Sequence, residues 1–263
     1  MRNDKDIASR IASFIPRPIQ NLIIETPIES FYQMIRQYAR IMTLPLHSQV
    51  YPSPVGKIEL LVCNDSFLMH PDIIEGGHDP YVIQDLCSLF NSVNSSVFYD
   101  IGSHFGYMVK IAILAGLEDS NIHTFEPDRF RFYVLSKNNK HDSIHLNKKF
   151  VSDTISKKEL TLDSYITAHD PPSVVKLDIE GAEYHALKGM SQTINSHNPI
   201  LFVEVHPAYL PTFGHQAEDV ISLLSTYQYD LQILEGGEWI PVSSNCSKYN
   251  TYPQAFTLKA LPR

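Results

Sequence analysis

The sequence has few of the residues that would assign it to a specialised class of proteins. Its three cysteines, Cys63, Cys87 and Cys246, are an odd number, lie far apart and form no C-x-x-C pair. This argues against a disulfide framework and against a zinc site. Lysine and arginine never form a run longer than a pair, and the net charge is −8. Because sequence-independent nucleic-acid binding draws on clustered positive charge, we expect no nucleic-acid partner.

Long apolar segments are missing as well. No apolar run reaches the length of a membrane span, and the first six residues carry mixed charge without a secretory pattern. We therefore expect no membrane span and a cytoplasmic location. Apolar residues make up 43% and charged residues 19% of the 263 residues. This composition is ordinary for a soluble protein, and the length suits one large α/β domain with an N-terminal extension.

The N-terminal part is predicted to be a separate extension. We expect residues 1–70 to form a helical and β extension of unknown role, followed by one domain over 71–263. Apolar side chains recur at helical spacing over 28–42, and 55–62 has the composition of a strand. The helical stripe predicts packing in a core or against another subunit, so a homo-oligomer formed through these helices is one expectation.

Strands and helices alternate from about residue 80 onward. The pattern predicts helices over 80–91, 106–116, 128–138, 182–190 and 216–227, with a short one after Leu162-Asp163. It predicts strands over 97–101, 121–126, 173–178, 199–205, 229–235 and 254–260, and a further one ending near 151–153. Such alternation predicts a mostly parallel sheet with helices on both faces. The last two strands lack a connecting helix, so we expect them to pair antiparallel.

A glycine turn with an acid at its mouth is the most informative local motif. The segment VFYDIGSHFGY over 97–107 reads as a strand, a tight turn and a helix start, with Asp100, Gly102 and Gly106 in the turn. Glycine there permits positive φ and close approach of a ligand to the backbone. The dinucleotide pattern G-x-G-x-x-G is missing, and a carboxylate would repel a pyrophosphate. The same carboxylate suits the ammonium of an amino-acid moiety.

A second acid follows the next predicted strand. The segment IHTFEP over 122–127 ends in Glu126, 26 residues after Asp100. An acid at this point of a nucleotide-binding βαβ unit accepts hydrogen bonds from ribose hydroxyls. S-adenosylmethionine carries both an ammonium and a ribose, so it is the ligand that fits both acids.

Charged residues also end the two strands that follow. The segment KLDIEGAE over 176–183 places Lys176 and Asp178 on one strand face, and FVEVH over 202–206 does the same for Glu204 and His206. Carboxyl ends of parallel strands share one rim, so these side chains should meet there. Lys176 could equally neutralise Asp178 or Glu204, and Glu183 could be a solvated residue of a first helical turn.

The ordered set of these segments resembles the FkbM family of S-adenosylmethionine-dependent methyltransferases. The resemblance covers about residues 80–210 and includes TLDSY over 161–165. It implies a Rossmann-like class I methyltransferase sheet, mostly parallel with an antiparallel last strand, and O-methylation of a sugar, glycan or natural-product hydroxyl. It also implies a cofactor site, in which Asp153 would meet the adenine amine. The residues of that site are Asp100, Gly102, Ser103, His104, Gly106, Glu126, Pro127, Asp153 and Asp178.

The catalytic expectation centres on His206. An imidazole has a pKa near the working pH, so His206, oriented by Glu204, is the favoured base, with Asp178 as second candidate and Lys176 beside the developing alkoxide. Asp178, Glu204 and His206 could also hold Mg²⁺ or Mn²⁺, which we do not favour. The alternatives are a nicotinamide-dependent oxidoreductase or a non-catalytic nucleotide-binding module on the same fold.

Overall fold

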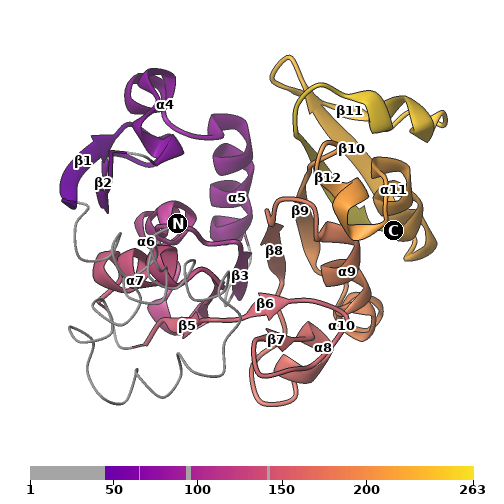
Figure 1. Cartoon of the computed structure of the whole chain (residues 1–263), viewed down its shortest axis with the longest axis horizontal. Helices are drawn as coiled ribbons and strands as arrows, with labels where there is room; N and C mark the ends of the chain where they lie inside the picture. Colours follow the sequence, from indigo (N-terminus) through magenta and orange to yellow (C-terminus); the bar gives the residue numbers. More distant parts are fainter. Residues whose placement is uncertain (1–44, 65, 93–95, 141–142) are drawn as a thin grey trace, which may run out of the picture. The chain divides into compact units, whose positions relative to one another are not determined.

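The computed structural model describes residues 45–64, 66–92, 96–140 and 143–263 (Figure 1). Pro45–Arg263 forms one compact unit. The helix predicted over 28–42, together with the subunit contact assigned to it, lies outside the described residues. Within the described segments, none of the helices has the length and apolar character needed to cross a bilayer.

A central eight-stranded sheet organises this unit, with the strand order β11-β10-β12-β9-β8-β3-β4-β5. Its strands in chain order are β3 (Phe98–Ile101), β4 (Ile122–Phe125), β5 (His145–Asn147), β8 (Val174–Leu177), β9 (Ile200–Val205), β10 (Tyr229–Glu235), β11 (Glu238–Pro241) and β12 (Phe256–Pro262). The five strands from β5 to β9 in this order are parallel, and β12 runs antiparallel to both β9 and β10. This confirms a mostly parallel sheet with an antiparallel last strand.

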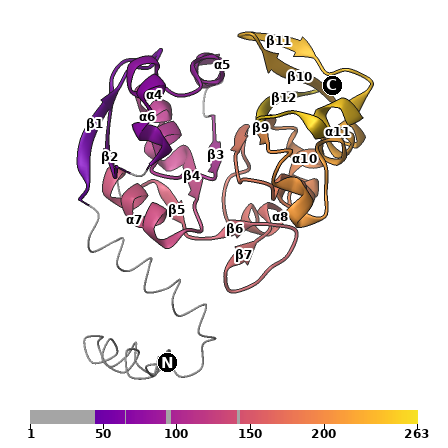
Figure 2. The same cartoon turned by 45° about the horizontal axis from the view of Figure 1, so that its top comes forward.

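Helices cover both faces of the sheet (Figures 1 and 2). The helices of the described unit are α4 (Pro71–Gly76), α5 (Pro80–Ser92), α6 (Tyr107–Leu114), α7 (Arg129–Asn138), α8 (Leu162–Tyr165), α9 (Glu183–Lys188), α10 (Ser191–His197) and α11 (Ala217–Thr226). On one face, Tyr99 and Val175 pack in a core shared with α9 and α11. The alternating residue Phe98 points to the other face, where its ring meets Phe90 of α5 at 5.1 Å between centroids.

A two-stranded sheet precedes these helices. Strand β1 (His47–Tyr51) pairs antiparallel with β2 (Ile58–Val62), which confirms the strand predicted over 55–62. The Asn138 side chain fastens this sheet to the domain, since it accepts from the Leu61 N–H at 2.7 Å and donates to the Phe105 carbonyl at 2.8 Å. The first strands therefore belong to the same compact unit as the central sheet, and a separate role for residues 1–70 stays a prediction.

Four elements differ from the sequence expectation. The strand expected to end near 151–153 is β6 (Phe150–Val151), which pairs with β7 (Glu159–Leu160) in a separate small sheet. The central sheet uses β5 instead, a three-residue strand with half-buried polar ends. Helix α10 and strand β11 had no sequence signal that we recognised.

The chain order of the strands creates a crevice. From β3 the chain passes to β4 on one side and later to β8 on the other. At such a point the connections leave in opposite directions, and the carboxyl ends of the strands line an open space where ligands bind. Residues that follow β3, β4, β8 and β9 therefore meet at one rim.

Candidate active site

The glycine turn after β3 is shaped by its protein neighbours. Gly102 has φ +90°, and a Cβ there would lie 1.8 Å from the Asp178 carbonyl oxygen. Gly106 has φ +88°, and a Cβ there would lie 2.4 Å from Nδ2 of Asn139. Both positions thus require glycine for the left-handed conformation and for close packing. We had expected glycine to be needed here for the approach of a ligand. The neighbouring backbone and side chains of the protein already require it.

Glu126 holds the same turn from the tip of β4. One carboxylate oxygen accepts from the His104 N–H at 2.9 Å and the other from the Asp128 N–H at 2.8 Å. Burial raises the pKa of Glu126 to about 7, although the two hydrogen bonds and the nearby Arg131 act to lower it. The residue predicted to bind ribose is therefore also the residue that orders the glycine turn.

Two buried polar atoms of the turn have no hydrogen-bond partner within the described segments. They are Oδ2 of Asp100 and Nδ1 of His104. Burial raises the pKa of Asp100 to about 6 and lowers the pKa of His104 to about 3. Ser103 supports the turn by donating from Oγ to the Asp100 carbonyl at 2.7 Å. An acceptor without a partner in a buried position is costly, so this turn is suited to a ligand that donates hydrogen bonds.

Lys176, Asp178 and Glu204 meet at the ends of β8 and β9, as predicted. Nζ of Lys176 lies 2.9 Å from Oδ2 of Asp178 and 4.0 Å from Oε2 of Glu204. The Lys176 side chain is only 6% exposed. Strand pairing sets Lys176 directly beside Asp100. The ammonium is therefore the buried counter-ion of this group of carboxylates.

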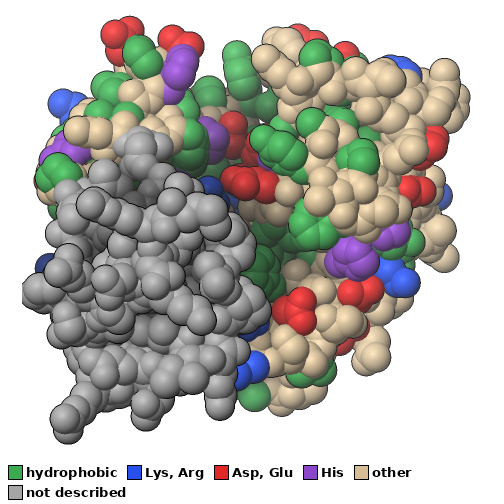
Figure 3. All heavy atoms as spheres, in the orientation of Figure 1, with side chains coloured by type: hydrophobic (Ala, Val, Ile, Leu, Met, Phe, Trp, Pro, Cys, Tyr) green, Lys and Arg blue, Asp and Glu red, His purple; other side chains and the backbone are tan. Residues whose placement is uncertain are grey.

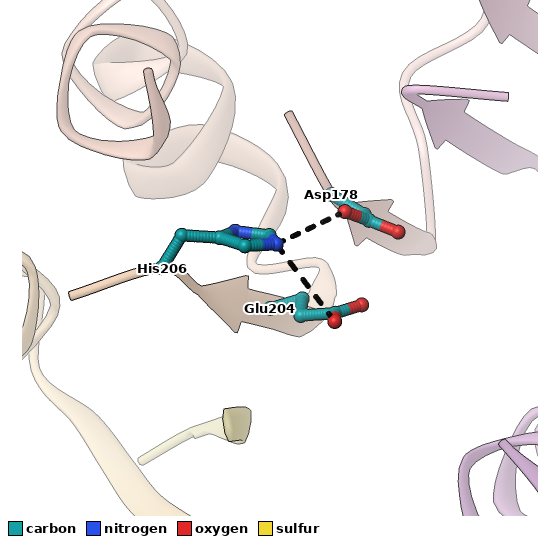
Figure 4. Close-up of side chains that lie close together, drawn as sticks. All are labelled: Asp178, Glu204 and His206. Carbon is teal, nitrogen blue, oxygen red and sulfur yellow. Dashed lines mark ion pairs between the residues drawn. The ribbon is translucent and has the colours of Figure 1, made fainter. Parts of the chain in front are cut away.

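His206 completes the cluster, with its Nε2 3.7 Å from Asp178 and 3.9 Å from Glu204 (Figure 4). Its other nitrogen, Nδ1, lies 2.7 Å from Oε1 of Glu183. We expected Glu204 to orient this histidine, and that was wrong, because Glu183 makes the short hydrogen bond. Glu183 is fully buried, and the same oxygen accepts from the Gly181 N–H at 2.9 Å. Of the two readings that the sequence left open for Glu183, the solvated one is therefore wrong.

The shared charges shift the pKa values of these groups in different directions. Burial opposes ionisation of Asp178, yet Lys176 and His206 outweigh it and lower the pKa of Asp178 to about 2. Burial and the charge of Asp178 raise the pKa of Glu204 to about 8. Burial would lower the pKa of His206, but the bond to Glu183 and the nearby carboxylates raise it. Burial also opposes the charge on Lys176, whose pKa the carboxylates nevertheless raise.

The same three side chains have the spacing of a metal site. One ligand atom each from Asp178, Glu204 and His206 lies within 4.8 Å of the others. Carboxylates and imidazole suit a divalent cation such as Mn²⁺. The Lys176 ammonium already bonds Asp178 from the other oxygen, so a second cation here would meet positive charge.

A comparison with known protein families assigns the chain to a family. The methyltransferase FkbM domain matches residues 94–231, which is 138 of the 263 residues. The chain belongs to the FkbM methyltransferase family. The match spans the glycine turn, Glu126 and the cluster around His206, which are the segments on which the resemblance in the sequence depended. It ends before β11 and begins after α5, so both lie outside the family domain.

Two solved structures with a similar chain path share little sequence with this FkbM family member. An FkbM methyltransferase from Methylobacillus flagellatus KT shares 18% identity with a TM-score of 0.46, over 65% of this chain and 45% of its own. This chain thus spans less than half of that protein. An S-adenosylmethionine-dependent O-methyltransferase from Thermotoga maritima shares 9% identity with a TM-score of 0.42, over 82% of this chain and 78% of its own. No curated protein matches the chain.

Two predicted cofactor residues of this family member lie apart from the buried cluster. Nδ1 of His185 lies 3.2 Å from Oδ1 of Asp153. His185 belongs to α9, which packs on the sheet face of Tyr99 and Val175, so the Asp153 carboxylate is paired on that face. Pro127 is half-buried and directly precedes Asp128, which caps α7. Contacts of either residue with a cofactor stay predictions.

The structure adds residues to the rim that the sequence analysis had not placed there. Glu183 ends the KLDIEGAE segment, two residues after Gly181, whose N–H it accepts. Its place in this segment was the sequence signal that could have assigned it to the rim. Arg131 of α7 reaches Glu180 after β8 at 3.5 Å. His78 and Asp79 directly precede α5, and the sequence had suggested them, with Tyr81, only as part of a lid. The charge of Asp79 acts on Lys176 and Glu204.

Proposed function

We propose that this FkbM family member is an S-adenosylmethionine-dependent O-methyltransferase acting on a hydroxyl of a sugar, glycan or natural product. The observation that carries the proposal is the pairing of His206 with the fully buried Glu183 at 2.7 Å. A histidine fixed at Nδ1 presents Nε2 to the crevice, which is the arrangement a general base requires. The crevice also holds the glycine turn with Asp100, whose Oδ2 has no hydrogen-bond partner within the described part of the chain.

The residues of the glycine turn fit a cofactor of this kind. Oδ2 of Asp100 is a buried acceptor without a partner among the described residues, which suits the ammonium of a methionine group. Glu126 lies at the tip of the neighbouring strand, where an acid can accept from ribose hydroxyls. In this proposal Asp100, Gly102 and Gly106 surround the methionine part, Glu126 the ribose and Asp153 the adenine amine.

The mechanism assigns separate tasks to the groups at the rim. Held by Asp100, Gly102, Gly106 and Glu126, the cofactor would supply a methyl group on a sulfonium. The acceptor oxygen would form its bond to that methyl carbon as the carbon–sulfur bond breaks, and the neutral thioether would be the leaving group. His206 takes the hydroxyl proton at Nε2, and Glu183 stabilises the resulting imidazolium through Nδ1. Lys176 keeps Asp178 ionised beside that proton. A positioned base of this type contributes roughly 10²–10⁴-fold to the rate.

The proposal is tested by ligand binding and by a variant of the base. Purified protein should bind S-adenosylhomocysteine in calorimetry and should not bind NAD. Binding of NAD alone would favour the oxidoreductase, and binding of neither would end the proposal. A panel of sugar and natural-product hydroxyls with S-adenosylmethionine labelled in its methyl group should then reveal transfer. His206→Ala should lose that transfer while it still binds S-adenosylhomocysteine; a protein that binds but never transfers would instead be the non-catalytic module.

A further inference from the structure

The start of α5 lies near the rim of the sheet that holds Lys176, Asp178, Glu204 and His206. Helix α5 precedes β3 with a short connection, so its first turn lies near the carboxyl ends of the strands. It covers the sheet face that carries Phe98, and Lys259 of β12 pairs with Asp85 one turn into the helix. Lys176 and Asp100 are cross-strand neighbours on that face.

His78 and Asp79 are fixed in this position by several contacts. The His78 N–H donates to Oη of Tyr107 at 3.2 Å, and its ring stands edge-on to Tyr107 at 5.7 Å and to Phe67 at 5.3 Å. Its Nε2 lies 3.3 Å from Oδ2 of Asp79. Burial lowers the pKa of His78, against the nearby Asp79 carboxylate, so the imidazole is neutral at pH 7. The charge of Asp79 is therefore not cancelled by its partner.

The backbone at Asp79 is strained. Its φ is +47°, a left-handed value that costs a non-glycine residue free energy. Two other non-glycine residues with positive φ, His104 at +48° and Glu180 at +53°, also border the crevice. Strained backbone is retained mainly where the surrounding structure or a function demands it. Here the strained conformation is found at a carboxylate beside the active site.

The Asp79 carboxylate is available to a ligand. Its side chain is 28% exposed, and no described residue makes a hydrogen bond to Oδ1. The Asp79 carboxylate also lies close enough to Lys176 and Glu204 for its charge to raise the pKa of both groups. The space-filling view shows acidic and histidine side chains gathered in the hollow between the two halves of the described unit (Figure 3).

We propose that Asp79 is an acceptor-binding residue, which takes a second hydrogen-bond donor of the methyl acceptor while His206 takes the proton of the methylated hydroxyl. This deepens the proposed function and rests on it. The acceptor is then a molecule with a hydroxyl or ammonium beside the methylated hydroxyl. Acceptors that present a carboxylate or phosphate at that point are disfavoured, because Asp79 and Asp178 would face them with like charge.

The test uses two cofactor analogues, so that no acceptor need be known. S-adenosylhomocysteine has no charge where the methyl would be, and sinefungin carries an ammonium there. We expect Asp79→Asn to lower the affinity for sinefungin by about threefold or more, because a negative charge near the ammonium of sinefungin is lost. It should leave S-adenosylhomocysteine affinity within about twofold. Asparagine tolerates left-handed φ, so the variant should fold normally.

A matched control comes from α4. Asp72 also lies near a histidine, His70 at 3.6 Å, but its side chain is 90% exposed. Asp72→Asn should therefore change neither affinity. If Asp79→Asn left the ratio of the two affinities unchanged, the inference would be overturned while the proposed function stood. If the wild-type protein bound neither analogue, the proposed function itself would fall, and the inference with it.

Discussion

Replacement of Gly102 by alanine tests whether the glycine turn is required by the protein itself. A Cβ at Gly102 would lie 1.8 Å from the Asp178 carbonyl oxygen and 3.2 Å from Cγ2 of Ile179. The Asp178 N–H donates to the Ile101 carbonyl at 2.9 Å, so this backbone cannot move without disturbing the junction of β3 and β8. The substitution therefore strains the turn and pushes against Asp178 at once.

The chain provides a control that separates these two effects. Gly116 has the same φ of +90°, but a Cβ there would meet nothing within 4 Å. Gly116→Ala should cost only the left-handed conformation, about 1–2 kcal/mol of the free energy of unfolding. Gly102→Ala adds overpacking against a fixed backbone, about 1–3 kcal/mol more. For a chain of this size each kcal/mol lowers the melting temperature by about 2–4 °C.

Urea unfolding followed by circular dichroism measures both variants against the wild type. We expect Gly102→Ala to be less stable than Gly116→Ala by at least about 1 kcal/mol. We also expect it alone to weaken S-adenosylhomocysteine binding, because its strain falls on Asp178. Equal stability of the two variants would refute the reasoning, and would mean that the turn relaxes freely.

Four further predictions concern charge at the rim and in the core. Glu183→Gln should lower kcat at least about tenfold, since hydrogen bonds to charged groups contribute about 1.5–3 kcal/mol. It should also shift the pH profile to lower pH by lowering the pKa of His206; an unshifted profile would contradict the pairing. Because the pKa of Asp100 is about 6, a cationic ligand should bind more tightly as pH rises from 5 to 7, with proton release seen by calorimetry in two buffers, and Asp100→Asn should remove this dependence. Dialysis against EDTA should leave methyl transfer unchanged; activity lost and restored by Mg²⁺ would establish a metal. Burial lowers the pKa of His123 to about 3, so the free energy of unfolding should fall as pH drops below the unfolded value, and His123→Gln should reduce that slope by up to about 1.4 kcal/mol per pH unit.

The sequence predicted the elements whose signal is local. Strands β3, β4, β8 and β9 are short apolar runs with an acid at or next to their end. Helices α6 and α7 begin after Gly106 and the N-cap Asp128. Strand β5 was missed because its three residues, His145–Asn147, are polar or half-buried at an edge. Helix α10 was missed because a distant group supports it. The Asp163 carboxylate accepts from the N–H groups of Gln192 and Thr193, 29 and 30 residues away.

The sequence predicted which side chains meet at the candidate site, but not which of them form hydrogen bonds with one another. Strand periodicity placed Lys176, Asp178, Glu204 and His206 at one rim, since alternate residues share a face. Which carboxylate orients His206 depends on the turn at Glu180 and Gly181, which have φ of +53° and +109° and bring α9 under the histidine. No periodicity specifies such a turn. The same holds for the start of α5, whose position follows from packing across the sheet.

The balance of charge at the rim gives a reason for its unusual number of acids. In the proposed reaction, the carboxylates at the rim face the sulfonium charge of the methyl donor before transfer, besides the ammonium that Asp100 binds throughout. Afterwards His206 carries one positive charge in its place, so the net charge that the carboxylates face is unchanged. A fixed set of buried carboxylates with one buried ammonium can therefore stabilise both states without reorganisation, which is how preorganised electrostatics lowers a barrier. Loss of Glu183 would break that balance only after transfer. Its effect should consequently fall on turnover and leave the binding of S-adenosylhomocysteine unchanged.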